Sequence, residues 1–364
     1  MKRTFFEQIG LADMERVHSQ MLQWIFSIEC DAITNANKLS LIKGLFGLDV
    51  SSINEVYTEY HNIDILIKTP EIIICIENKL KSSQHSNQLE TYKKTLNSEF
   101  ISQVVRFYYL TLANENSDDI DWICLSYRHL LNELRKVFIT SKTSFYGQIF
   151  SEYLTTLDNI VSTAEDFLSS PQSYNIVFSD GSKKKAHKIK NSIYSRQELI
   201  SANQLETIFQ KLYFRAVLNE IGYQRDYFIT ETRGNAILGI VIKRSVKLMY
   251  KGAKDRLDFS MQFQNGGFKT FCVSENYVTS SKNDIPPEIT SAFDSLSILY
   301  AHTGYIKVSN APRSKAQCSV TKRINNWGSF SVKDFAILFL KELEISKIII
   351  NEYLLPSLEV DEFI

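Results

Sequence analysis

Two apolar runs separated by a short polar turn form the most regular pattern in the first third of the chain. The runs are residues 62–68 and 72–79, and the turn between them, residues 69–71, contains a proline. Apolar runs on both sides of such a turn predict a β-hairpin. A turn centred in this segment places Asp64, near the start of the first strand, opposite Glu77, near the end of the second.

The polar residues at the open end of this hairpin are the candidate chemistry. Side chains alternate between the two faces of a strand, so Glu77 and Lys79 point to one face and Asn78 points to the other. Asp64 and Glu77 are then two close carboxylates beside an ammonium group. Their mutual repulsion is relieved by a divalent cation, and a nearby lysine can stabilise an anion. This arrangement indicates metal-assisted cleavage of a phosphodiester.

Helix and strand patterns flank the hairpin on both sides. Apolar residues recur at three- and four-residue steps within residues 13–28, which predicts an amphipathic helix with Glu15 in its first turn. A second helix is expected from about residue 86, with Gln88 and Tyr92 four residues apart on one face. The segments that follow have the pattern of two short strands, residues 106–112 and 121–127.

In the order of its elements and in its residue pattern, this part of the sequence resembles the PD-(D/E)XK nuclease superfamily, which includes many restriction endonucleases and repair nucleases. Asp64 matches the first acidic position, and Glu77-Asn78-Lys79 matches the E-x-K element, with twelve residues between Asp64 and Glu77. Ile63 stands where the motif's name has proline. The resemblance covers roughly residues 10–135 and is most similar to a bacterial subgroup of nuclease-like proteins.

The resemblance implies a site and a cofactor. Asp64, Glu77 and the backbone carbonyl of Asn78 would hold one or two Mg²⁺ ions, with Mn²⁺ as a substitute, and Glu15 would help through a second ion or a bound water. Lys79 would orient the attacking water or stabilise the transition-state charge. Gln88 would position the phosphate or the water. DNA is the implied partner, restriction or phage defence the implied setting, and a homodimer the assembly of many members.

Simpler interpretations exist for each residue and for the whole. Glu15 could only favour the positive end of a helix dipole. Asp64, Glu77 and Lys79 could be turn or strand-end charges, and Gln88 and Tyr92 ordinary helix residues. Two other functions fit the same fold, a catalytically silent DNA-binding or assembly module and a nuclease that cleaves RNA.

Length and composition predict how the fold is organised. A chain of 364 residues, 44% of them hydrophobic, is long enough for two domains with substantial cores. We expect an α/β nuclease-like domain at 1–170, with a restriction-endonuclease-like mixed sheet flanked by helices. A lysine-rich linker or loop at 171–200 and an α+β domain at 201–364 follow. The second domain would bind the substrate or a partner.

Charge is balanced over the whole chain but not along it. Residues 1–160 carry 15 Lys and Arg and 20 Asp and Glu, a net charge of −5, whereas the remaining residues carry 26 and 21, a net charge of +5. The densest basic segment comprises Lys183, Lys184, Lys185, Lys188 and Lys190. On a loop these lysines could contact nucleic acid or form a solvated linker. A second basic run comprises Lys243, Arg244, Lys247, Lys251, Lys254 and Arg256, which could also be ordinary exposed sheet positions.

The C-terminal half has a pattern of strands framed by helices. A helix is expected at 202–222 and a long one from about residue 331. The strands expected between them are residues 227–232, 236–242, 245–250, 256–263, 268–273, 304–308 and 317–322, which together predict a central antiparallel sheet. The five cysteines form no C-x-x-C pair and lie in apolar contexts, so we expect buried, reduced thiols in a cytoplasmic protein. The sequence has no apolar run long enough for a signal peptide or a membrane span.

Overall fold

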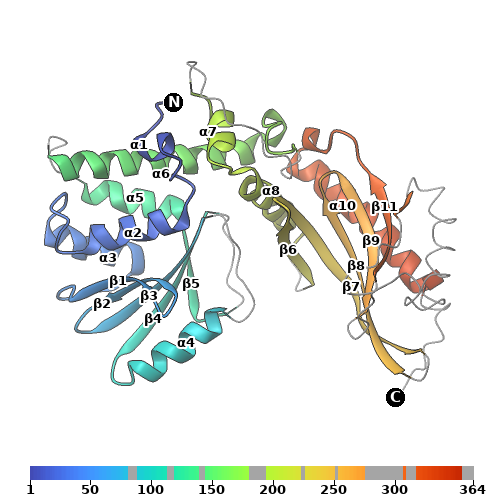
Figure 1. The fold of residues 1–364 in the computed structure, drawn as a ribbon, viewed down its shortest axis with the longest axis horizontal. Coiled ribbons are helices and arrows are strands. Elements are labelled where there is room, and N and C mark those ends of the chain that lie inside the picture. Colours follow the sequence, from blue (N-terminus) through green and yellow to red (C-terminus); the bar gives the residue numbers. More distant parts are fainter. Residues whose placement is uncertain are drawn as a thin grey trace. The chain divides into compact units, whose positions relative to one another are not determined.

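Two compact units make up the chain, Met1–Ser169 with Lys184–Arg215 and Ser170–Lys183 with Ala216–Ile364. The computed structural model describes residues 1–80, 88–112, 119–138, 144–179, 194–222, 226–250, 253–274, 306–308 and 317–354. Each unit has a sheet of its own (Figure 1). The predicted division into domains at 1–170 and 201–364 concerns independent folding and stays a prediction.

The first unit is built on a five-stranded mixed sheet whose strands lie in chain order (Figure 1). The strands are β1 (Glu55–Tyr60), β2 (Ile63–Lys68), β3 (Ile72–Lys79), β4 (Val104–Thr111) and β5 (Trp122–Ser126). Neighbours among β1, β2 and β3 are antiparallel, whereas β4 and β5 run parallel to β3. Parallel neighbours need a crossover connection, which α4 (Gln88–Glu99) provides between β3 and β4. The predicted mixed sheet is confirmed.

Helices cover both faces of this sheet. α4 lies on one face, and α2 (Glu15–Phe26), α3 (Asn35–Phe46), α5 (Tyr127–Val137) and α6 (Phe145–Ser169) are layered over the other (Figure 1). α2 packs directly on β1, β2 and β3, and α5 lies against α3 and α6. The central strand β3 is buried along nearly its whole length, as expected for a strand covered on both faces.

The core between α4 and the sheet leads directly to the candidate site. It contains side chains from the strands and from α4, among them Leu66, Ile73, Cys75, Leu89, Leu96, Phe107 and Trp122. Because strand side chains alternate, Glu77 and Lys79 continue the row that Ile73 and Cys75 begin on β3. The apolar row therefore ends in the charged residues, which are held by a well-packed strand.

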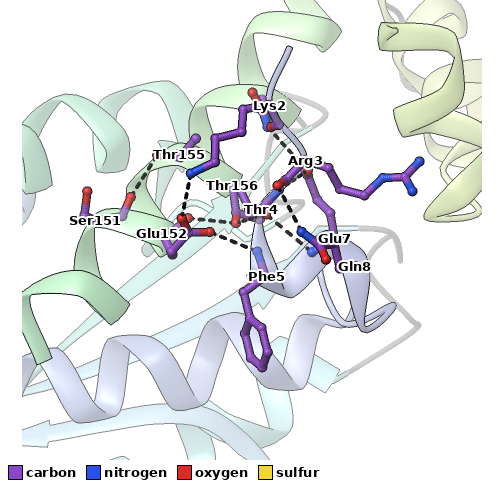
Figure 2. Close-up of polar contacts among 11 residues, drawn as sticks. Lys2, Arg3, Thr4, Phe5, Glu7, Gln8, Ser151, Glu152, Thr155 and Thr156 are labelled. Carbon is purple, nitrogen blue, oxygen red and sulfur yellow. Dashed lines mark hydrogen bonds and ion pairs between the residues drawn. The ribbon is translucent and has the colours of Figure 1, made fainter. Parts of the chain in front are cut away.

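Polar contacts anchor the N-terminal segment to α6 (Figure 2). Thr4 begins the short helix α1 (Phe5–Gln8) with a capping box, which satisfies N–H groups that a helix start leaves unpaired. The Thr4 hydroxyl lies 2.8 Å from the Thr156 hydroxyl, and the Phe5 N–H donates to the Glu152 carboxylate at 2.9 Å. These contacts hold the chain in place just before α2.

The second unit contains a six-stranded antiparallel sheet in the order β10-β11-β9-β8-β7-β6. The strands are β6 (Tyr227–Thr232), β7 (Asn235–Tyr250), β8 (Ala253–Gln264), β9 (Gly267–Ser274), β10 (Ile306–Val308) and β11 (Gln317–Arg323). α10 (Val332–Ile348), followed by a π-helical segment Ile349–Leu354, packs on the sheet through a ring stack between Phe335 and Phe268. Lys322 of β11 also pairs with the buried Glu342 of α10 at 2.6 Å. The predicted antiparallel sheet is confirmed.

Two predicted elements differ from the structure. The helix expected at 202–222 is α8 (Glu206–Ile221), which begins later than expected because Gln204 has a left-handed backbone with φ of 51°. A separate short helix, α7 (Arg196–Ala202), ends where α8 was expected to begin. The strands expected at 236–242 and 245–250 are one strand, β7, which stays paired to β8 through two register shifts. A Lys-Arg pair thus marks bulges rather than a turn.

The cysteine prediction is confirmed at three described positions and wrong at one. Cys30, Cys75 and Cys272 are buried, but Cys124 is exposed on β5, an outer strand of its sheet. The side chain of Cys318 lies outside the described residues. Among the helices that the structure describes, none has the length and apolar character needed to cross a membrane.

Candidate active site

The β2–β3 hairpin has the register that the sequence predicts. Ile65 pairs with Ile76 and Leu66 with Cys75, which places Asp64 opposite Glu77. The Asn78 backbone N–H donates a hydrogen bond of 2.7 Å to Asp64 Oδ2. The first carboxylate of the site is therefore oriented by the backbone of the neighbouring strand.

Glu77 and Lys79 form a close ion pair on the same face of β3. Lys79 Nζ lies 2.6 Å from Glu77 Oε1, and the two side chains are only 9% and 1% exposed. Glu77 Oε2 is buried and accepts no hydrogen bond from any described residue. A buried carboxylate oxygen without a partner is costly, so this oxygen is available to a further cationic ligand.

The two carboxylates repel each other in a buried setting, and their pKa values show it. Burial raises the pKa of Asp64 to about 6, against the opposing effects of the Asn78 N–H and Lys79. Burial first, and then the charge of Asp64, raise the pKa of Glu77 to about 8. Burial alone would lower the pKa of Lys79, but the carboxylates around it outweigh burial and raise it. The raised pKa values favour a proton on one of the two carboxylates when no cation is bound.

Glu15 joins this group from the first turn of α2. It is the first residue of that helix and is half-buried. Its charge raises the pKa values of both Asp64 and Glu77. The structure therefore brings Glu15 to the same end of the sheet as the E-x-K element, although the two are far apart in sequence.

Asn78 holds the site to the helices behind it. Its side chain is fully buried on the face opposite Glu77, as the strand alternation predicts. Asn78 Nδ2 donates to the backbone oxygen of Glu15 and to Ser19 Oγ, both at 3.1 Å, and its Oδ1 accepts from the Tyr127 hydroxyl at 2.6 Å. Asn78 thus ties β3 to α2 and α5 and sets where the helix bearing Glu15 begins.

Replacing Tyr127 by Phe is expected to lower the free energy of unfolding by roughly 1–3 kcal/mol, because it leaves Asn78 Oδ1 buried without a donor. Urea denaturation measures the change. Tyr146→Phe is the matched control, since Tyr146 is 40% exposed and water can replace its hydroxyl. Equal stability of the two variants would contradict the role of Asn78 as a buried tie.

Gln88 uses its side-chain nitrogen for a hydrogen bond within the protein, whereas its side-chain oxygen has no partner among the described residues. Gln88 Nε2 donates to the Tyr92 hydroxyl at 2.6 Å, and that hydroxyl donates to the backbone oxygen of Asn62 at 2.6 Å. His61 and Asn62 both have left-handed backbones and form the tight turn that precedes Asp64. Gln88 Oε1 is buried and, within the described chain, accepts no hydrogen bond. This oxygen remains available to a ligand.

Some predicted residues fall outside the described chain, and some described residues were not predicted. Lys183, Lys184, Lys185, Lys188 and Lys190 lie outside the described residues. Ser19 and Tyr127 had no predicted role in the site, although they lie within the predicted helix at 13–28 and the predicted strand at 121–127. Their hydrogen bonds to the Asn78 side chain form only because α2 and α5 pack against β3.

The side chains at this end of the sheet fit a divalent cation. Carboxylate oxygens are the ligands that Mg²⁺ prefers, and Asp64 and Glu77 offer two carboxylates, one with an unpartnered oxygen. Among the described residues no group of three or more His, Cys, Asp or Glu is arranged to hold a metal. Mg²⁺ commonly keeps several waters and takes one or two carboxylates from the protein, so the donor set accords with that ion.

Comparison with known families agrees with this geometry. Residues 4–155 match the family model of the PD-(D/E)XK nuclease superfamily, a range that includes α2, the β2–β3 hairpin, α4, β4 and β5. A search of curated proteins and of solved structures finds no match to the chain. The family match and the five-stranded mixed sheet together assign residues 4–155 to the PD-(D/E)XK nuclease superfamily.

Proposed function

We propose that the protein is a metal-dependent endonuclease that hydrolyses phosphodiester bonds in DNA. The observation that carries the proposal is the buried pair of carboxylates, Asp64 and Glu77, held beside the ammonium group of Lys79. A surface that only binds phosphate has no use for two carboxylates, because they repel it. A site that binds a divalent cation and a phosphate needs both signs of charge.

Each residue has a role in this proposal. Asp64 and Glu77, with the backbone carbonyl of Asn78, would hold Mg²⁺, or Mn²⁺ in its place. Such an ion supplies Lewis-acid stabilisation of phosphoryl oxygens and lowers the pKa of water. Lys79 would orient the attacking water or stabilise negative charge in the transition state.

The two remaining polar residues would support this centre. Glu15 would assist through a second ion or a bound water. Gln88 would use its unpartnered oxygen to position the water, or would contact the phosphate.

Metal binding is expected to tighten as pH rises from about 6 to about 8, because the carboxylate pair must lose its proton to bind the ion. Asp64 and Glu77 also make the stability of the metal-free protein depend on pH. Their raised pKa values contribute stability that is fully present below the ordinary pKa values of 3.8 and 4.5. This contribution is lost as pH rises through the folded-state pKa values of about 6 and about 8. The melting temperature, measured with and without Mg²⁺ across this range, should therefore diverge with rising pH. Glu77→Gln should remove most of the divergence, and a divergence unchanged in that variant would contradict the assignment.

Digestion of supercoiled plasmid tests the proposal. Nicking or linearisation with Mg²⁺ or Mn²⁺, lost with EDTA and in Glu77→Ala, is the expected result. Structured RNA digested in parallel separates the two substrates, and cleavage of RNA alone would replace DNA with RNA. Absence of both cleavage and calorimetric metal binding would overturn the proposal in favour of a silent binding module.

The setting we propose is restriction or defence against invading DNA, which rests on analogy with the fold. Cells carrying the chain should resist phage better than cells carrying Glu77→Ala, and equal plaque counts would contradict this setting. A homodimer is the assembly that would cut both strands, and sedimentation of the intact chain tests it.

A further inference from the structure

A buried histidine one helical turn after Glu15 has no part in the chemistry described so far. His18 lies on α2 and is 1% exposed. Both of its ring nitrogens have partners. Nε2 lies 2.9 Å from the Ala12 backbone oxygen, and Nδ1 lies 3.2 Å from the hydroxyl of Tyr153 on α6. A buried ring that is bonded at both nitrogens is held in one orientation.

The partners of His18 fix which nitrogen carries the proton. A backbone oxygen can only accept, so Nε2 donates to Ala12. In a neutral ring, Nδ1 then accepts from the Tyr153 hydroxyl. Burial lowers the pKa of His18, against the opposing effects of the Ala12 oxygen and the charge of Glu15, so the ring is neutral at neutral pH. His18 thus joins the segment before α2 to α6.

The start of α2 is held by contacts other than a side-chain cap. Met14, the N-cap residue, makes no side-chain hydrogen bond to the first turn. On one side, Asn78 donates to the backbone oxygen of Glu15 at 3.1 Å. On the other side, His18 holds the backbone oxygen of Ala12, three residues before Glu15. The backbone that carries the Glu15 side chain is therefore fixed from both directions.

His18 also supports the contact that Asn78 makes. Its ring packs edge-to-face on the ring of Tyr127, with centroids 5.7 Å apart and planes at 88°. The Tyr127 hydroxyl donates to Asn78 Oδ1 at 2.6 Å. Because protein interiors are close-packed, a change at the His18 ring is felt by Tyr127 and through it by Asn78. Both contacts that fix the start of α2 depend on His18.

We propose that His18 is a positioning residue of the active site, which holds the Glu15 carboxylate at the end of the sheet where the metal ion would bind. The proposal rests on the proposed function, since it matters for chemistry only if Glu15 assists cleavage. Glu15 is half-buried, so its reach is set by where its backbone lies. Misplacing a group by about 1 Å can cost on the order of 10²-fold in rate.

The same contacts could serve stability alone. Loss of His18 would then lower the free energy of unfolding and reduce cleavage only through the fraction of folded protein, whatever residue stands at position 15. A positioning role acts through the Glu15 carboxylate and disappears when that carboxylate is removed. A double-mutant cycle between His18 and Glu15 therefore distinguishes the two roles.

Single-turnover plasmid cleavage at saturating Mg²⁺, expressed per folded protein, measures this cycle. His18→Asn removes the donor to Ala12 and is expected to slow cleavage about 10- to 100-fold. In the Glu15→Gln background, the same change should alter the rate by less than about twofold. His18→Gln, whose amide nitrogen can take the place of Nε2, should keep most of the rate. His129→Asn is the matched control and should cleave as the parent does, since His129 Nε2 makes the same kind of bond to the Gly44 backbone oxygen, at 3.1 Å.

Tyr153→Phe is the second variant, to be used if His18→Asn does not fold. It keeps the aromatic ring and removes the donor to Nδ1, so a smaller loss of rate is expected, which should also disappear beside Glu15→Gln. A parental rate in the variant used, or a loss that persists in full beside Glu15→Gln, would overturn the proposal. A parental rate in Glu15→Gln alone, or equal losses in His18→Gln and His18→Asn, would overturn it as well.

Hydrogen exchange separates this proposal from the proposed function, because it needs no cleavage. His18→Asn should speed the exchange of backbone amides in residues 11–19, relative to the same segment in His129→Asn. Unchanged exchange there would overturn the positioning role even in a protein that cleaves DNA. Faster exchange in a protein that cleaves neither DNA nor RNA with any metal would support the hold of His18 on α2 and overturn the nuclease.

Discussion

Replacement of Glu77 by Gln is expected to reduce plasmid cleavage by at least about 10³-fold without lowering the free energy of unfolding of the metal-free protein. A metal ion supplies several kcal/mol of transition-state stabilisation, and each 1.36 kcal/mol corresponds to tenfold in rate. In the proposed site, Glu77→Gln removes one of the metal's two carboxylate ligands, the one with the unpartnered oxygen.

The stability of this variant has a separate physical reason. Glu77 is 1% exposed, and burial next to Asp64 raises its pKa. Gln has the same shape and no charge, so the repulsion with Asp64 disappears and Lys79 keeps Asp64 as its counter-charge. Cleavage assays and urea denaturation measure the two effects.

Glu90→Gln is the matched control for this prediction. Glu90 lies in the same unit on α4, with a side chain that is 55% exposed and paired to Lys94 across one helical turn. We expect it to leave cleavage unchanged. A Glu77→Gln protein that cleaves as the parent does would remove Glu77 from the site.

Replacement of Lys79 by Met is expected to reduce cleavage by about 10²–10³-fold while metal binding persists. This is the effect of removing one preorganised group that stabilises developing negative charge. Met keeps the apolar stem of the buried side chain, so packing is preserved. Single-turnover cleavage at saturating metal, beside calorimetry, separates the chemical step from the binding step.

The pH dependence of this variant provides a second measurement. Lys79 opposes the upward shift of the Glu77 pKa, so its removal raises that pKa further. Metal affinity should then fall at neutral pH and recover at higher pH. Lys94→Met, at a site 76% exposed, is the control. An unchanged rate per bound metal in Lys79→Met would assign Lys79 to structure instead of chemistry.

The hairpin that carries the site could be predicted because its determinants are local. Turn position and strand alternation are set by a few consecutive residues, so Asp64 opposite Glu77 and the opposite faces of Glu77 and Asn78 follow directly. The same logic fails for β7, where Lys243 and Arg244 interrupt the apolar pattern but β8 continues to pair across them. Bulges depend on the partner strand, which the local pattern does not contain.

The surroundings of the site could not be predicted, because they depend on packing between distant segments. Asn78 bonds to Glu15, Ser19 and Tyr127, which are 63, 59 and 49 residues away in the chain. Each partner is an ordinary helix residue when it is considered alone. Only the placement of α2 and α5 against β3 buries Asn78 and gives its side chain three partners.

By itself, the sequence determined the hairpin, its register, the residues that the E-x-K element presents on each face and the antiparallel character of the second sheet. These follow from periodicity and turn chemistry, which act over a few residues. The tertiary structure decided how deeply Glu77 and Lys79 are buried and which helices hold the strand that carries them. Burial and long-range hydrogen bonds are properties of the packed chain, and they set the charge state of the site.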